Sequence, residues 1–253
     1  MTTFLFAVFP YIALVVFIVG MIWRYRYDKF GWTTRSSQLY ESNMLRVGAP
    51  LFHYGILLAV LGHAMGLLIP KSWTNAIVSP EIYHMVAVVG GVLAGVMVTI
   101  GFLILVFRRR TVKTVFNATT VNDKIMYLVL GATIFFGMWN TISTALSHSY
   151  DYREGVSPWF RSIFSFQPQP ELLAEAPIQF QGHAVTAFLL ILILPFTRLV
   201  HMFSAPIGYL SRPYVVYRSR GDSGTRPNPS AHAPRGTWNS PTATKDKPGE
   251  KVS

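Results

Sequence analysis

Long apolar runs alternate with short polar stretches along this chain. A helix needs about 20 apolar residues to cross a hydrocarbon core of about 30 Å. Five runs approach or exceed that length, at residues 4–23, 49–69, 82–107, 125–146 and 180–203. The fourth run is the least apolar, because its second half carries Asn and Thr side chains. We therefore expect an all-α integral membrane protein with five transmembrane helices.

Several residues predict where these helices begin or bend. Pro80 suits the first turn of the third helix, and Asn122 or Asp123 can cap the fourth. Pro195 lies inside the fifth run and predicts a kink, because proline removes a backbone hydrogen bond and crowds the preceding turn. Aromatic residues in the loop 147–179 predict a short helix at the membrane interface.

Basic residues predict the orientation of the helices. The loops after the first and third runs hold ten Lys or Arg residues: Arg24, Arg26, Lys29, Arg35, Arg46, Arg108, Arg109, Arg110, Lys113 and Lys124. The loops on the other side hold three: Lys71, Arg153 and Arg161. Because basic loops stay in the cytoplasm, we expect an outer N-terminus and a cytoplasmic C-terminus.

Composition narrows the class further. The net charge is +11, of which residues 212–253 supply +5 through eight Lys/Arg against three Asp/Glu. This distribution predicts membrane topology and lipid contact, with no nucleic-acid site. Residues 1–218 are expected to form the membrane domain. Residues 219–253 are rich in Ser, Pro, Gly and charge, and are expected to be a disordered cytoplasmic tail.

Cysteine is absent from the chain. That excludes thiolate-bound iron–sulfur clusters, disulfides and covalently attached haem. No Lys or Arg precedes Arg24, so the first run lacks the basic region of a cleaved signal and is expected to be a retained span.

Two histidine pairs in apolar helices are the strongest functional signal. His53 and His63 lie in the second run, and His183 and His201 lie in the fifth. Imidazole is costly in lipid unless it is used. Matching by depth joins His63 with His183, the outer pair, and His53 with His201, the inner pair. Four such ligands predict two b haems held between the second and fifth helices.

The spacings of the two pairs differ. Ten residues between His53 and His63 span about 15 Å of helix, whereas eighteen between His183 and His201 span about 27 Å. Eighteen residues also return to the same helical face, if the helix is continuous. A bend at Pro195 would reduce the mismatch in depth.

Two further residues are candidates near the haems. Arg198 lies one turn before His201, where it can pair with a propionate of the inner haem or extend toward the cytoplasmic interface. His84 lies in the first turn of the third helix, level with the outer pair. It is a candidate proton acceptor for a quinol, and an ordinary interfacial histidine is the alternative.

Two segments carry a family resemblance. They are LFHYGILLAVLGHAMGLLIP (51–70) and GHAVTAFLLILILPFTRLVHMFSAPIGYLSRPY (182–214). With their histidine spacings of ten and eighteen, they resemble the gamma subunit of membrane-bound respiratory nitrate reductase, a dihaem cytochrome b. The resemblance covers about residues 4–218.

The resemblance implies a function for the whole assembly. In that family, menaquinol or ubiquinol is oxidised near the outer haem. The inner haem passes electrons to an iron–sulfur beta subunit and then to a molybdenum alpha subunit that reduces nitrate, at the bacterial cytoplasmic membrane. The same four histidines would be the ligands. The family carries a lysine associated with quinol where His84 stands here, so this chain departs from the family pattern at that position.

Two alternatives remain open from the sequence. The chain can be a cytochrome b anchor of another respiratory oxidoreductase, such as a formate dehydrogenase or a hydrogenase. It can also be a haem-free transporter or assembly protein, in which the histidines line a proton path.

Overall fold

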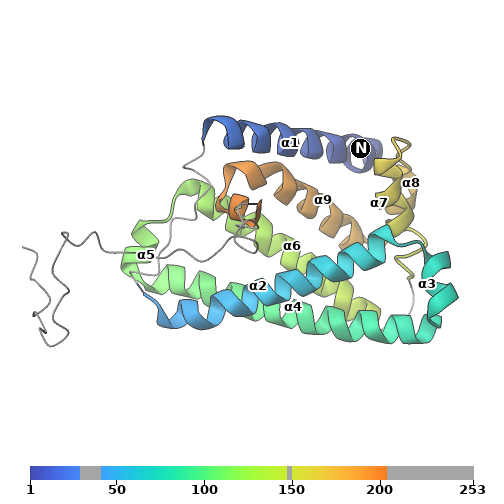
Figure 1. The fold of residues 1–253 in the computed structure, drawn as a ribbon, viewed down its shortest axis with the longest axis horizontal. Coiled ribbons are helices and arrows are strands. Elements are labelled where there is room, and N and C mark those ends of the chain that lie inside the picture. The colour runs from blue at the N-terminus through green and yellow to red at the C-terminus, as the bar shows by residue number, and fades with distance from the viewer. Residues whose placement is uncertain (29–40, 147–149, 204–253) are drawn as a thin grey trace, which may run out of the picture. The chain divides into compact units, whose positions relative to one another are not determined.

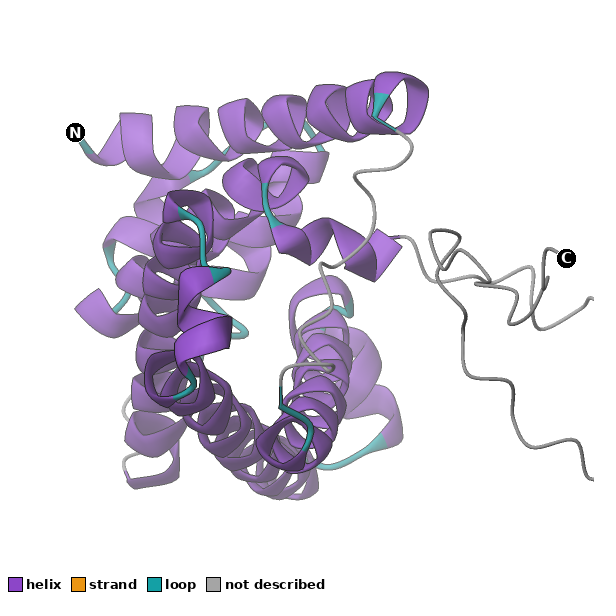
Figure 2. Cartoon of the chain, turned by 90° about the vertical axis from the view of Figure 1, so that its left-hand side faces the viewer, coloured by secondary structure: helices purple, strands orange, loops and turns teal. Residues whose placement is uncertain are grey.

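The computed structural model describes residues 1–28, 41–146 and 150–203, and every regular element in these ranges is helical (Figures 1 and 2). The longer helices are α1 (Phe9–Tyr27), α2 (Asn43–His63), α4 (Pro80–Thr111), α6 (Val121–Leu146) and α9 (Ile178–Ile193). The shorter ones are α3 (Lys71–Ile77), α5 (Lys113–Asn117), α7 (Val156–Phe164) and α8 (Pro170–Ala174). Single π-helical turns are η1 (Phe4–Val8) and η3 (Ala64–Leu68), and 3₁₀ turns are η4 (Leu194–Phe196) and η5 (Arg198–Phe203).

The five predicted spans are confirmed. Helical segments of 24, 26, 32, 26 and 19 residues are long and apolar enough to cross a membrane: Phe4–Tyr27, Asn43–Leu68, Pro80–Thr111, Val121–Leu146 and Ile178–Phe196. Helix α7 lies in the loop where a short aromatic helix was expected. Helix α3 lies in the loop between the second and third spans, for which the sequence analysis predicted no helix.

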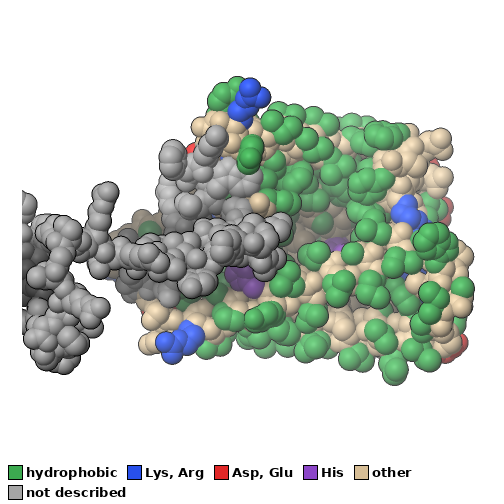
Figure 3. All heavy atoms as spheres, viewed as in Figure 1, with side chains coloured by type: hydrophobic (Ala, Val, Ile, Leu, Met, Phe, Trp, Pro, Cys, Tyr) green, Lys and Arg blue, Asp and Glu red, His purple; other side chains and the backbone are tan. Residues whose placement is uncertain are grey.

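The outward surface of these helices is apolar. Leu57 on α2 is 63% exposed and Leu128 on α6 is 75% exposed, and hydrophobic side chains cover most of the face in Figure 3. Large exposed apolar side chains are unfavourable in water but match lipid chains. The arrangement therefore agrees with a bundle that is surrounded by lipid.

Helices α2 and α4 lie side by side along their length (Figure 1). Their backbones approach closely at two glycines. A Cβ atom on Gly101 of α4 would lie 2.5 Å from the backbone nitrogen of Phe52, and one on Gly55 of α2 would lie 2.8 Å from that of Val98. Small residues at such contacts are what allow membrane helices to approach without side-chain collision.

Helix α4 begins where the sequence predicted, whereas the cap of α6 is a different residue. The Ser79 hydroxyl accepts from the amide of Ile82, so α4 begins at Pro80 as expected. At α6, the Asp123 carboxylate accepts from the Thr120 amide, and the Thr120 hydroxyl accepts from the Asp123 amide. This reciprocal capping box makes Thr120 the capping residue, where Asn122 or Asp123 had been expected.

Pro195 does more than kink the last span. Helix α9 ends at Ile193, η4 follows, and Thr197 is extended with ψ of 177° before η5 begins. The expectation that His183 and His201 share one face of a continuous helix is therefore wrong. The non-α-helical segment 194–203 carries His201, and a separation of 27 Å calculated for a straight helix does not apply.

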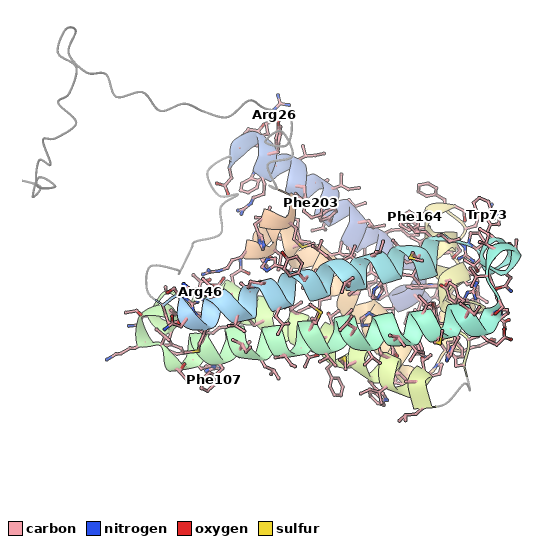
Figure 4. The ribbon with its side chains drawn as sticks, turned by 60° about the horizontal axis from the view of Figure 1, so that its bottom comes forward. Arg26, Arg46, Trp73, Phe107, Phe164 and Phe203 are labelled. Atoms are coloured by element: carbon pink, nitrogen blue, oxygen red, sulfur yellow. The ribbon has the colours of Figure 1, made fainter. Side chains whose placement is uncertain are left out.

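Basic side chains gather at one end of the bundle. Figure 4 shows Arg26 and Arg46 toward the end opposite Trp73 and Phe164. Arg108 at the C-terminal end of α4 contacts Glu41, just before α2, through bonds of 2.5 and 2.6 Å. Lys29, Arg35 and the predicted tail 219–253 lie outside the described residues.

Candidate functional site

The inner pair meets between α2 and η5. The imidazole centres of His53 and His201 lie 5.9 Å apart, and the ring planes differ by 61°. His53 lies ten residues into α2, toward the end of the bundle that carries Arg46. The outer pair lies on α2 and α9, farther from that end. The ring centres of His63 and His183 are 5.7 Å apart, and their planes differ by 29°.

All four imidazoles contact a backbone carbonyl through Nδ1. His53 and His63 each contact the carbonyl four residues earlier, on Ala49 at 2.7 Å and Ala59 at 2.6 Å. His183 Nδ1 lies 3.0 Å from the Thr133 oxygen on α6, and His201 Nδ1 lies 2.6 Å from the Arg198 oxygen. A carbonyl oxygen only accepts, so each Nδ1 carries the proton. Each Nε2 therefore presents a lone pair, as metal-ligating histidines do.

The spacing of each pair fits a shared metal centre. Two imidazole–metal bonds of about 2 Å, with roughly 1 Å from each nitrogen to its ring centre, separate the ring centres by about 6 Å. Among the described residues, no group of three or more His, Cys, Asp or Glu side chains is placed to hold a lone metal ion. Two axial histidines with the other ligands from a macrocycle are the donor set of a haem.

Glycine residues lie next to both histidines of the outer pair. A Cβ atom on Gly137 of α6 would lie 3.0 Å from Cε1 of His183. A Cβ atom on Gly62, next to His63, would meet no protein atom within 4 Å. Histidine side chains show at two places on the face drawn in Figure 3, separated along the direction of the long helices.

Comparison with known proteins identifies the chain's relatives. The family model for the nitrate reductase gamma subunit matches residues 2–220. The nitrate reductase gamma chain of Bacillus subtilis is 41% identical over 217 residues, which cover 85% of this chain and 97% of that protein. The respiratory nitrate reductase 2 gamma chain of Escherichia coli is 32% identical over 229 residues, covering 87% and 98%. The chain belongs to the nitrate reductase gamma subunit family.

A further relative is a longer protein. The nitrate reductase-like protein NarX of Mycobacterium tuberculosis is 55% identical over 216 residues, which cover 84% of this chain. The chain spans about a third of that relative's length, since the matched part is 33% of it.

In this gamma-family chain, Arg198 has a protein partner. Its Nε and Nη2 atoms donate to the two carboxylate oxygens of Asp123, at 2.5 and 2.8 Å. The hydrogen bonds from Arg198 to Asp123 raise the pKa of Arg198. The propionate contact expected for Arg198 stays a prediction, and sequence reasoning missed Asp123 as its partner.

His84 lies near the start of α4, is half-buried, and follows Tyr83, which contacts residues of the loop before α7. The hydroxyl oxygens of Tyr83 and Tyr152 are 3.4 Å apart, and the Arg153 guanidinium lies 3.9 Å from the centre of the Tyr83 ring. Burial raises the pKa of Tyr152, which keeps its hydroxyl protonated. Tyr152 also contacts the α2 side of the site, because a Cβ atom on Gly66 would lie 2.9 Å from its hydroxyl.

Lys71, the first residue of α3, forms ion pairs with the loop that contains Tyr152 and Arg153. Lys71 Nζ donates to Asp151 at 2.7 Å and to Glu154 at 2.5 Å. These bonds raise the pKa of Lys71. Burial alone would raise the pKa of Asp151, but its bond with Lys71 makes the net change a lowering.

Two contacts to the histidines were missed from the sequence. The Thr133 carbonyl and Gly137 both reach His183 from α6, fifty and forty-six residues earlier in the chain. The polar second half of the fourth run was a weak signal that α6 faces other helices there. His148, interpreted from the sequence as a solvated residue, lies outside the described residues.

Proposed function

We propose that this chain is the membrane-anchoring dihaem cytochrome b subunit of a respiratory nitrate reductase, and that it oxidises quinol. The observation that carries the proposal is the pairing of four Nδ1-protonated histidines at ring separations of 5.7 and 5.9 Å. Family membership supports it, because the gamma chains of Bacillus subtilis and Escherichia coli are named as nitrate reductase chains.

The histidines hold and orient the two haems. His63 and His183 would ligate the outer haem, and His53 and His201 the inner haem. When bound, b haem supplies a one-electron carrier. If each pair held one haem through its two Nε2 atoms, the protein would supply both iron ligands, which favours electron transfer over oxygen chemistry. The Nδ1 bonds fix the ring orientations and make Nε2 a better donor.

The proposed direction of electron transfer depends on which end of the bundle faces the cytoplasm. The end with Arg46 and Arg108 would face the cytoplasm by the positive-inside rule, so the N-terminus lies outside. Menaquinol or ubiquinol would bind near the outer pair, where the His84 imidazole accepts a hydroxyl proton. Electrons would leave near the inner pair toward an iron–sulfur beta subunit, and then a molybdenum alpha subunit, at the bacterial cytoplasmic membrane.

A difference spectrum tests the proposal. Membranes that contain the full chain are expected to show a b-type band when reduced, with two irons per chain in the purified protein. A purified chain without b-type absorption would instead support a haem-free transporter or assembly protein.

Co-purification tests the partner. We expect the native assembly to contain iron–sulfur and molybdenum subunits that reduce nitrate with quinol electrons. Recovery with a formate dehydrogenase or a hydrogenase would assign the chain to another respiratory enzyme.

A further inference from the structure

His201 lies on a segment that its own secondary structure does not fix firmly. The segment comprises two 3₁₀ turns, η4 and η5, with Thr197 extended between them. Bonds in 3₁₀ turns have poorer geometry than those in an α-helix. His53, His63 and His183 instead lie on α-helices. The position of His201 therefore depends on what holds the segment from outside.

The first turn of α6 holds this segment through side chains. Asp123 binds Arg198 in a bidentate pair, with side chains that are 6% and 18% exposed. The Asn122 amide donates to the backbone carbonyl of Phe196. Asp123 is itself fixed, because it shares the capping box with Thr120. Bidentate arginine–carboxylate pairs restrict orientation as well as distance.

The residue that Asp123 holds is the same residue that orients His201. The Arg198 side chain contacts Asp123, while its carbonyl oxygen lies 2.6 Å from His201 Nδ1. A change in the position of Arg198 would thus rotate or shift the imidazole. The connection runs from α6 through one residue to the ring that faces His53.

Helix α1 closes the other side of the segment. A Cβ atom on Gly20 would lie 2.8 Å from Cβ of Pro195, so only a glycine allows this approach. The rings of Phe17 and Phe203 lie 5.4 Å apart, and Figure 4 shows Phe203 beside α1. These contacts are apolar, so they restrict distance more than orientation. The directional contacts come from α6.

We propose that Asp123 is a positioning residue for the inner haem, acting through Arg198 on the orientation of His201. The inference rests on the proposed function, in which His201 is a haem ligand. Removing the partner of a ligating residue typically weakens metal binding about 10- to 100-fold. The effect is confined to the inner haem, because the outer pair takes its Nδ1 bonds from Ala59 and Thr133.

The test uses Asp123→Asn and Arg198→Lys in the full chain, solubilised from membranes. Both substitutions remove the bidentate pair while preserving side-chain size. The matched control is Asp151→Asn, which breaks the ion pair between Lys71 of α3 and the loop before α7, at the other end of the bundle. Haem loss to excess apomyoglobin is followed with time, and the low-spin ferric haem signals are recorded by electron paramagnetic resonance. A His63→Ala background isolates the inner haem.

We expect about 10-fold faster loss of one haem in each variant and a shifted signal from that haem alone. In the His63→Ala background, the single remaining haem is the one affected, and Asp151→Asn changes neither signal. The retained outer haem reports that the bundle is folded. Equal loss of both haems, or loss rates and signals identical to the unaltered protein, would overturn the positioning role. An unaltered chain that binds no haem would instead overturn the proposed function.

Discussion

The outer and inner histidine pairs are built in different ways. His63 is the last residue of α2, and His183 lies within α9. In the inner pair, His53 lies on α2, but His201 follows a broken helix and depends on Arg198 and, through it, on Asp123. The ring separations are nevertheless 5.7 and 5.9 Å. Similar pair geometry thus arises at the outer site from two residues on α-helices, with a long-range contact from Thr133 to His183, and at the inner site from side-chain contacts that hold a segment outside any α-helix.

The largest expected effect comes from removing one ligand. His63→Ala should abolish the outer haem and quinol oxidation while leaving the inner haem, and His53→Ala should remove the inner haem alone. The reason is that each imidazole serves one pair. Iron and haem content per purified chain, measured with the absorption spectrum, checks this. Loss of both haems from either variant would contradict independent sites.

A smaller effect is expected at His84, to which the proposed function assigns proton transfer at the outer site. His84→Ala should slow quinol oxidation by about 100-fold or more, since general-base groups typically contribute that much. Both haems should remain. Steady-state quinol turnover and haem content are the measurements. Unchanged turnover would make His84 an ordinary interfacial residue.

A larger side chain at Gly20 should destabilise the inner site more than the outer site. Gly20→Leu forces atoms into Pro195 and should cost about 1–3 kcal/mol, mainly by displacing the segment that carries His201. Gly90→Leu is the control, because a Cβ atom there meets no protein atom within 4 Å. Thermal unfolding and selective loss of the inner haem are measured. An equal response of both variants would show that Pro195 is not restrained by α1.

The smallest effect is expected at Lys71. Lys71→Met should reduce stability by less than about 1 kcal/mol, because the ion pair with Asp151 is partly exposed. The ion pair contributes fully to the free energy of unfolding between pH values of about 4 and 10.4, the pKa values of Asp and Lys in an unfolded chain. It is lost as pH falls through the lowered pKa of Asp151 or rises through the raised pKa of Lys71. Unfolding measured across pH should show the two proteins converging at both extremes.

The five spans and the partners within each pair were predictable from the sequence. Apolar run lengths predict the spans, and the depths of His53, His63, His183 and His201 predict which rings meet. These predictions depend on the length of each apolar run and on which end of its run each histidine lies nearer, and both are read directly from the sequence.

The support around the histidines was not predictable. Asp123 contacts Arg198 across 75 positions, and Thr133 contacts His183 across 50. No periodicity reports such contacts, because they depend on how α6 packs against the last span. The sequence predicted a kink at Pro195, but α9 ends at Ile193 and no α-helix follows in the described residues. A proline alone does not determine whether a helix resumes.

The protonated Nδ1 atoms have a consequence for how iron porphyrin would enter the two proposed haem sites. A thiol ligand must release a proton when it binds a metal, which makes assembly depend on acidity. Here every imidazole already directs its hydrogen to a peptide oxygen and its free electron pair to the opposite side. Unlike such a thiol, each imidazole turns Nε2 away from its hydrogen-bonded Nδ1, so haem insertion at the proposed sites would need no change of tautomer.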